Sequence, residues 1–228
     1  SWTFDGGTPA TSTEQNPRVV YNTPGTYSVS LTASNAHGTD TETKTGYITV
    51  TRPVEVIVEW NFPTNSADAT ADAGITANLT KTLSVGGGVG TISYTANGAT
   101  TKCARANNWR QGSGSKYWTV NFTTSGYQNI KFWSKQSASG NTGPRNFKVQ
   151  YSLNGSTWTD VSGATVTCAT NWTTGVLEGI SLPEACNNQN TVYLRWLMSS
   201  NSAISGQLSN NTYSYIDDIV VKGVYMAV

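Results

Sequence analysis

Short segments in which apolar and polar residues alternate make up most of this 228-residue chain. Such alternation places successive side chains on opposite faces, which is typical of half-buried β-strands. Residues 27–33 and 147–153 carry apolar side chains at every second position, and Asn154-Gly155 separates the second of these runs from a further strand-like run at residues 157–161. Asn-Gly between two alternating runs is a strong signal for a β-hairpin. Because no long helical period separates these segments, the sequence predicts an all-β protein.

The composition excludes several partners. Fourteen Lys and Arg residues balance thirteen Asp and Glu residues, so the net charge is only +1. Duplex nucleic acid and anionic membranes attract a clustered basic excess, which this chain lacks. No apolar run reaches the ~18–20 residues that a membrane-spanning helix needs. We therefore expect no nucleic-acid partner and no membrane insertion, while eight tryptophans supply bulk for hydrophobic cores.

The N-terminal part carries aromatic, turn and strand residues in one register. The pattern consists of Trp2-Thr3-Phe4-Asp5-Gly6-Gly7, Asn16-Pro17, Tyr21 and Pro24-Gly25-Thr26-Tyr27-Ser28-Val29-Ser30-Leu31. Over residues 1–51 it resembles the latter part of a PKD domain, although Val19 stands where a histidine often sits. The resemblance implies a partial immunoglobulin-like β-sandwich that acts as a spacer in secreted proteins. Because the family's first strands are missing, we expect this chain to be cut from a longer polypeptide, with those strands supplied by something else or replaced by unusual packing.

A second domain is expected after a linker at residues 52–54, and it would span residues 55–228. Its alternating segments predict an antiparallel jelly-roll β-sandwich, with one short helix around residues 67–79. Residues 149–161 and 215–221 resemble the galactose-binding-like and MAM-like jelly rolls of secreted bacterial enzymes. The first of these segments is common in β-sandwiches of several functions, so it indicates the fold more than any ligand.

Catalysis fits the sequence poorly. His37 is the only histidine and lies in a turn of the first domain, so the second domain has none for a Ser/His or Cys/His pair. Two carboxylates can act without histidine, but the nine acids of the second domain form no recognisable motif. Among the cysteines, Cys168 with Cys186 is the more plausible disulfide, and the alternative is that they and Cys103 are buried thiols. We expect this fragment to be no enzyme, even where its parent protein is one.

Adjacent acids near the C-terminus suggest a structural calcium ion. On a strand one of Asp217 and Asp218 must point inward, and a buried unpaired carboxylate costs several kcal/mol unless a cation or hydrogen bonds compensate it. In similar jelly rolls the corresponding acid holds Ca²⁺ against the first strand, which here contributes Glu59 and Asn61. Oxygen ligands of this kind suit Ca²⁺. The alternative is an ordinary acid pair that caps backbone amides.

Aromatic residues among polar ones indicate carbohydrate binding. A sugar ring packs its C–H groups on an aromatic face, while its hydroxyls need planar polar groups nearby. The candidate ligand-binding residues are Trp109, Arg110, Arg145 and Asn146, which lie in two polar loops. Alternatively, Trp109 covers the end of the core. Trp118, Trp133 and Trp196 lie within strands and are expected in the core. Trp158 is expected to brace its hairpin, and Trp172 fits either role.

These patterns favour a non-catalytic accessory region of a secreted or cell-surface protein. The first domain would be a spacer, and the second would bind a polysaccharide or glycan and hold an attached catalytic domain near its substrate. A second hypothesis is a protein–protein, adhesion or structural module of a secreted protease or nuclease. A third is a glycosidase or lyase, which would need a deep cleft that holds two acids.

Overall fold

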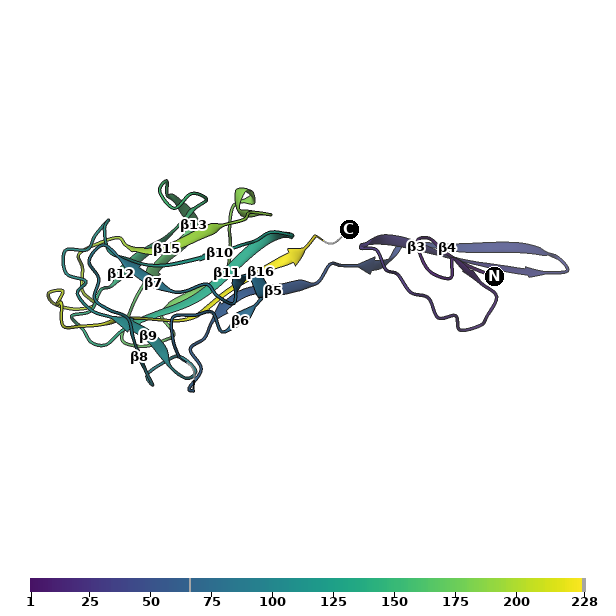
Figure 1. Ribbon diagram of the computed structural model, residues 1–228. Coiled ribbons are helices and arrows are strands. Elements are labelled where there is room, and N and C mark those ends of the chain that lie inside the picture. Colours follow the sequence, from purple (N-terminus) through teal and green to yellow (C-terminus); the bar gives the residue numbers. More distant parts are fainter. Residues whose placement is uncertain (66, 227–228) are drawn as a thin grey trace. The chain divides into compact units, whose positions relative to one another are not determined.

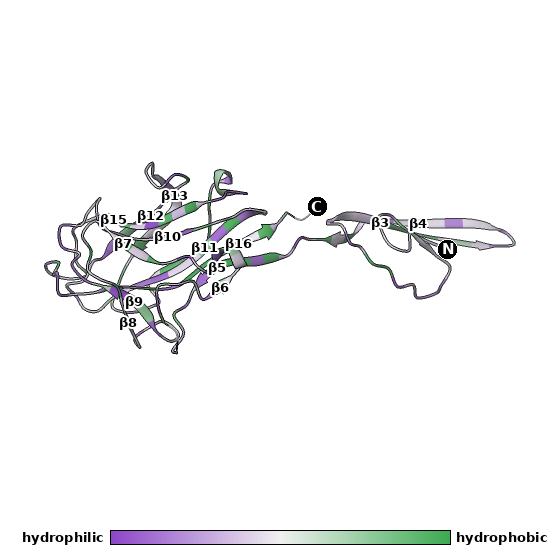
Figure 2. Ribbon diagram, viewed as in Figure 1, coloured by the Kyte–Doolittle hydropathy of each residue, from purple (hydrophilic) through white to green (hydrophobic). Residues whose placement is uncertain are grey.

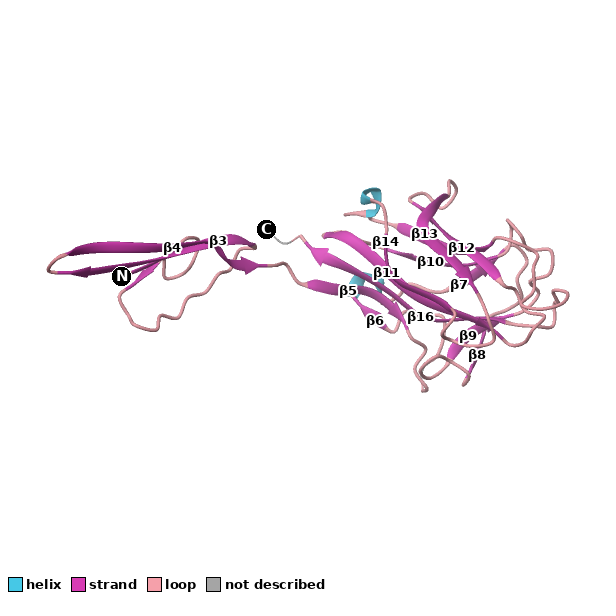
Figure 3. Ribbon diagram, turned by 180° about the vertical axis from the view of Figure 1, so that it is seen from behind, coloured by secondary structure: helices cyan, strands magenta, loops and turns pink. Residues whose placement is uncertain are grey.

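The computed structural model describes residues 1–65 and 67–226, and it confirms the all-β expectation (Figures 1 and 3). The strands pair antiparallel throughout the described sheets. The chain folds into two compact units, Ser1–Pro53 and Val54–Val228. No described helix is long and apolar enough to cross a membrane.

The first unit is a four-stranded sheet with the order β2-β1-β3-β4. Its strands are β1 (Trp2–Phe4), β2 (Thr11–Ser12), β3 (Gly25–Asn35) and β4 (Gly38–Val50). Trp2 pairs with Leu31 and Phe4 with Val29, so large apolar side chains share one face. Strand alternation places Thr3 and its pairing partner Ser30 on the other face. The unit is thus one layer whose apolar face borders a hollow of about 440 Å³.

The second unit stacks two sheets. The five-stranded sheet has the order β13-β12-β15-β10-β7, and the seven-stranded sheet contains β14-β11-β16-β5-β6, with β9 paired to β16 and β8 paired to β9. The first sheet comprises β7 (Ser84–Gly86), β10 (Tyr117–Phe122), β12 (Asn146–Ser152), β13 (Thr159–Thr167) and β15 (Val192–Met198). The second comprises β5 (Val54–Trp60), β6 (Ala73–Gly74), β8 (Ser93–Thr95), β9 (Cys103–Ala106), β11 (Tyr127–Ala138), β14 (Gly175–Ser181) and β16 (Ser214–Tyr225).

The core lies between these sheets because alternate side chains point inward. In β10, Trp118, Val120 and Phe122 are buried while the residues between them are half-exposed. Figure 2 shows the same mixture of apolar and polar colour along the strands, with polar colour prominent in the loops. Each fully buried side chain of this size contributes ~1.5–3 kcal/mol of hydrophobic stabilisation.

The short helix expected around residues 67–79 is only one 3₁₀ turn, η1 (Thr76–Asn78), and a second such turn, η2, spans Glu184–Cys186. Part of the expected helix is instead β6, which pairs with β5. Gly74 has a φ of +131°, and a Cβ there would overlap the backbone of Ile57. A glycine is therefore needed for this close approach.

The three cysteines are buried and free, which matches the alternative of buried thiols and not a Cys168–Cys186 disulfide. Burial raises the pKa of each thiol to about 12. Buried neutral thiols of this kind behave as small apolar side chains.

Candidate functional site

The structure places Trp109 in the core, so the solvent-facing ring expected from the sequence is wrong. Its exposed fraction is 0%. The ring lies 5.7 Å from that of Trp118 and 5.4 Å from that of Phe147, and Nε1 donates to the carbonyl of Ala106. This matches the alternative in which Trp109 closes the end of the core. No face of this ring is available to a sugar.

Of the other predicted ligand-binding residues, Arg110 and Arg145 lie in loops and Asn146 begins β12, and all three contact the loop between β15 and β16. Arg110 is exposed and its amide donates to Asn210, while the amide of Arg145, also exposed, donates to the carbonyl of Ser202. The amide nitrogen of Asn146 donates to the hydroxyl of Ser200. The structure brings these segments together, but Trp109 offers them no exposed ring.

Asp217 is fully buried and acts as a backbone cap. Its Oδ2 accepts the amide of Ala99 at 2.7 Å, and its Oδ1 accepts the amide of Asp218 at 2.8 Å. Burial raises the pKa of this carboxyl to about 7, although both amide hydrogen bonds act in the opposite direction. This arrangement matches the alternative given by the sequence, an acid pair that caps backbone amides.

The remaining candidate calcium ligands contact other side chains of the protein. Asp218 makes an ion pair with Lys135 at 2.9 Å, and Glu59 accepts a hydrogen bond from the side-chain amide of Asn61. Over residues 1–65 and 67–226, no three His, Cys, Asp or Glu side chains are grouped to hold a metal. Amide donors contact both oxygens of Asp217, whereas the buried Oδ1 of Asn61 has no hydrogen-bond partner among the described residues, so calcium at this end of β5 stays a prediction.

A groove crosses the outer face of the seven-stranded sheet. Its central hollow has a volume of about 410 Å³. The charged and aromatic side chains that line it are Glu59, Trp133, Lys135, Glu178, Asp218 and Lys222. A second hollow of about 410 Å³ adjoins it at Trp133, and a third of about 570 Å³ adjoins it at Glu178. This volume range is usual for ligand sites, and the three hollows offer a path for an extended ligand.

Trp133 is the aromatic centre of this groove. It follows the core residue Phe132 on β11 and therefore points outward, where its ring is half-buried. The pairing of β11 with β14 is irregular at this point, and the ring rests near Gly179. Bulges commonly re-aim side chains next to functional sites. The ammonium group of Lys222 lies 5.1 Å from the ring centroid.

The sequence reasoning missed Trp133 by assigning it to the core. A signal was present, because Lys131, Trp133 and Lys135 are alternate residues of the strand and therefore lie on the same face of it. Two lysines on one face of a strand mark that face as solvated. Trp118 and Trp196 are fully buried, as expected.

Trp172 closes one end of the groove. It borders the third hollow with Lys135 and Glu178, and its ring stacks on that of Tyr215 at 6.2 Å. Its Nε1 donates to the carbonyl of Asn97. Since this hydrogen bond and the stacking hold the half-buried ring, the groove has a rigid aromatic end.

Comparisons with known proteins found one family model and a number of similar solved structures. The family model of the PKD domain matches residues 1–50. No curated protein matches the sequence. Among solved structures, a tandem of two CBM22 modules from Paenibacillus barcinonensis has a TM-score of 0.52 at 10% identity, over 79% of this chain and 48% of that one. The chain thus aligns with about half of the tandem.

Two further solved structures are similar. The xylan-binding CBM22-1 domain from the same organism has a TM-score of 0.44 at 11% identity, over 78% of this chain and 100% of that one. A CBM4 structure has a TM-score of 0.44 at 16% identity, over 62% of this chain and 86% of that one. These three structures are carbohydrate-binding modules, and the likeness to the tandem shows a shared β-sandwich fold.

Proposed function

We propose that the second unit binds a polysaccharide chain along the groove and that the fragment has no catalytic role. The observation that carries this proposal is the half-buried ring of Trp133, which lies among carboxylates and ammonium groups on the groove floor. The ring offers a surface for the C–H face of a sugar. The carboxylates of Glu59, Glu178 and Asp218 accept hydrogen bonds from hydroxyls, and Lys135 and Lys222 donate them.

The balance of charge supports a neutral ligand. Three carboxylates and two ammonium groups share the central hollow, and Lys135 is already paired with Asp218. An anionic polymer would be repelled by the carboxylates, and a cationic polymer would be repelled by the ammonium groups. The fold shared with carbohydrate-binding modules supports the same ligand class.

The organisation of the longer protein is a further part of this proposal. Residues 1–51 would act as a PKD spacer, residues 52–54 as a linker and residues 55–228 as the binding module. The module would hold an attached catalytic domain close to its polysaccharide, outside the cell. Weak binding suffices for this role, because tethering raises the effective concentration of the enzyme at the polymer.

Affinity electrophoresis against soluble xylans, β-glucans and mannans tests the proposal. We expect at least one polymer to retard the protein and Trp133→Ala to weaken that interaction by ~10-fold or more, as for a central aromatic contact. Tyr47→Ala is the matched control, since Tyr47 is 66% exposed in the first unit. Equal migration of all three proteins in every gel would contradict the proposal.

One feature keeps catalysis as a second candidate. Glu59, Glu178 and Asp218 share one hollow, and a glycosidase needs two carboxylates flanking the scissile bond. Release of reducing ends from a retained polymer, lost in Glu178→Gln, would assign the groove to hydrolysis.

A further inference from the structure

One arginine and three aromatic rings gather on the outer face of the five-stranded sheet, away from the groove. Their centre is Arg195 on β15, whose guanidinium lies 4.1 Å from the ring centroid of Trp158 and 5.2 Å from that of Tyr117. Tyr193 meets Trp158 nearly edge-on, with the ring planes at 72° and the centroids 6.4 Å apart. These four residues, the arginine cluster, are all half-buried. Part of each side chain is therefore open to a ligand.

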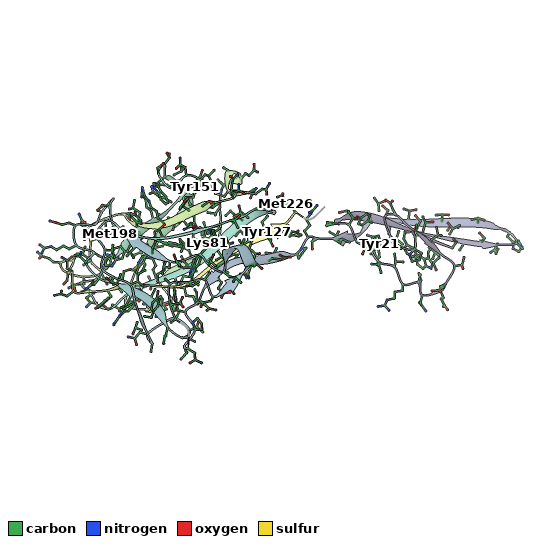
Figure 4. The ribbon with its side chains drawn as sticks, in the orientation of Figure 1. Tyr21, Lys81, Tyr127, Tyr151, Met198 and Met226 are labelled. Carbon is green, nitrogen blue, oxygen red and sulfur yellow. The ribbon has the colours of Figure 1, made fainter. Side chains whose placement is uncertain are left out.

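Strand alternation places the arginine cluster on the outer face. Leu194 and Trp196 are fully buried, so Arg195 between them projects outward. Figure 4 labels Tyr151 and Met198, whose side chains pack on the core side of the same sheet. The cluster and the core therefore use opposite faces of these strands.

A buried glutamine orients the guanidinium. Nε of Arg195 donates to Gln150 at 2.8 Å, and the side-chain amide of Gln150, which is only 8% exposed, donates to Asp160. The other N–H groups of Arg195 donate to no residue within 1–65 or 67–226. Since an arginine side chain carries five N–H donors, four remain for a ligand.

A carboxylate fits these free donors. Guanidinium and carboxylate groups form two parallel charge-assisted hydrogen bonds, which are about twice as strong as bonds between neutral groups. Burial lowers the pKa of Arg195, because the protein removes part of the water that would stabilise the charge. The nearby carboxylate of Asp160 accepts its hydrogen bonds from Gln150 and from Lys148, the latter at 2.9 Å. Within the described residues, the guanidinium thus has no carboxylate bonded to it, and an incoming one would supply it.

The surroundings of the arginine cluster are basic. The five-stranded sheet and the loops that lead into β10, β12 and β15 contain five cations but one carboxylate, Asp160. These segments are residues 84–86, 107–122, 139–167 and 187–198. Arg110 and Arg145 are exposed at the end of the sheet where β10 and β12 begin. Such a surface attracts an acidic partner and repels a basic one.

The geometry of the arginine cluster favours a protein partner. Trp, Tyr and Arg are enriched at the residues that dominate binding energy in protein interfaces. A sugar or a nucleobase needs an open ring face, but the guanidinium covers one face of Trp158 and Tyr193 stands at a steep angle to it. The aliphatic part of an acidic side chain and its apolar neighbours can instead pack on the open ring edges. The carboxylate then reaches the free N–H groups.

We infer that the arginine cluster is a docking site for an acidic segment of a partner protein, in which one glutamate or aspartate side chain binds Arg195. The exposed arginines at the end of the sheet would attract further acids of this segment. The docking site uses none of the residues of the groove. The second unit would therefore hold its polysaccharide and its protein partner at the same time, on two different faces.

Peptide arrays test this inference. Three sets of short synthetic peptides share the same randomised flanks and differ only in the central residue, which is Glu, Gln or Lys. We expect the wild-type protein to bind members of the Glu set ~10-fold more tightly than their Gln counterparts, because the latter lose a charge-assisted pair. Arg195→Gln should remove this preference, and Arg195→Lys should weaken it by a similar factor, since lysine lacks the fork of donors. Arg18→Gln, which removes an exposed arginine of the first unit, is the matched control and should bind like the wild type.

NMR of the wild-type protein covers the case in which a variant fails to fold. The tightest Glu peptide should shift the indole N–H signal of Trp158 and leave that of Trp133, in the groove, in place. Absence of binding to all peptides, equal binding of the three sets, or binding without movement of the Trp158 signal would overturn the inference. Arg195-dependent binding of polygalacturonate or single-stranded DNA that is tighter than that of every peptide would also overturn it, because the ligand would then be another class of anion. None of these outcomes affects the groove proposal, which has its own retardation test.

Discussion

Asp217 should make the stability of the second unit fall as the pH rises from 4 to 7. Burial raises the pKa of this carboxyl from 3.8 to about 7. The unfolded chain releases the proton near pH 4, whereas the folded protein keeps it until about pH 7. Within this window the folded state binds more protons, so its stability decreases with rising pH. The contribution of Asp217 is fully present below pH 4 and is lost above 7.

The size of the effect follows from the shift of about three pKa units. Each unit corresponds to 1.36 kcal/mol, so the free energy of unfolding should fall by about 4 kcal/mol at most across the window. We expect about 2–4 kcal/mol, since the structure relaxes when the carboxyl ionises. Asp72, whose pKa burial also raises, adds a smaller slope of the same sign.

Urea denaturation at pH 4.5, 5.5, 6.5 and 7.5 measures this slope. Asp217→Asn cannot titrate, so most of the slope should disappear, whatever the variant's absolute stability. Asp160→Asn is the control, because hydrogen bonds from Lys148 and Gln150 lower the pKa of Asp160 and place its titration below the window. A wild-type profile that is flat or rises from pH 4.5 to 7.5 would refute the reasoning, as would an unchanged slope in Asp217→Asn.

Three further predictions concern Trp109, the three cysteines and calcium. Trp109→Ala should cost ~3–5 kcal/mol in urea denaturation, because it empties a fully buried site, while Trp109→Phe should stay folded and keep its retardation by polysaccharide. A loss of retardation in that folded variant would restore Trp109 to the ligand site. The three buried thiols should resist iodoacetamide at pH 8 until the protein unfolds, and rapid labelling of the native protein would contradict their burial. Adding calcium and then EDTA should shift the melting temperature by less than 1 °C, roughly the resolution of the measurement, if Asp217 is only a backbone cap, and a larger rise with calcium would support the calcium ion expected from the sequence.

The sequence predicted the architecture because strand patterns are local. Alternation in residues 27–33 and the Asn154-Gly155 turn are each readable within ten residues, and both belong to the strands and hairpin they indicated. The all-β class follows from many such segments. The helix expected around residues 67–79 failed because small residues there also permit the close approach of Gly74 to β5.

The site was harder to predict because exposure depends on long-range packing. Trp109 lies among polar residues in sequence, yet its contacts come from Trp118 and Phe147 on two different strands. Trp133 follows a core phenylalanine in its strand. The one sequence sign that it faces solvent is that it shares a strand face with two lysines. The sequence could show that large rings exist, but the sheet stacking decides which of them face solvent.

The most direct test of the central claim follows the indole N–H signals of the eight tryptophans by NMR during titration with xylan, β-glucan and mannan oligosaccharides. Carbohydrate binding in the groove predicts that the signals of Trp133 and Trp172 move with one common dissociation constant, while those of the buried Trp109, Trp118 and Trp196 stay in place. Titrations in which no indole signal moves, or in which only Trp2 of the first unit responds, would contradict the account.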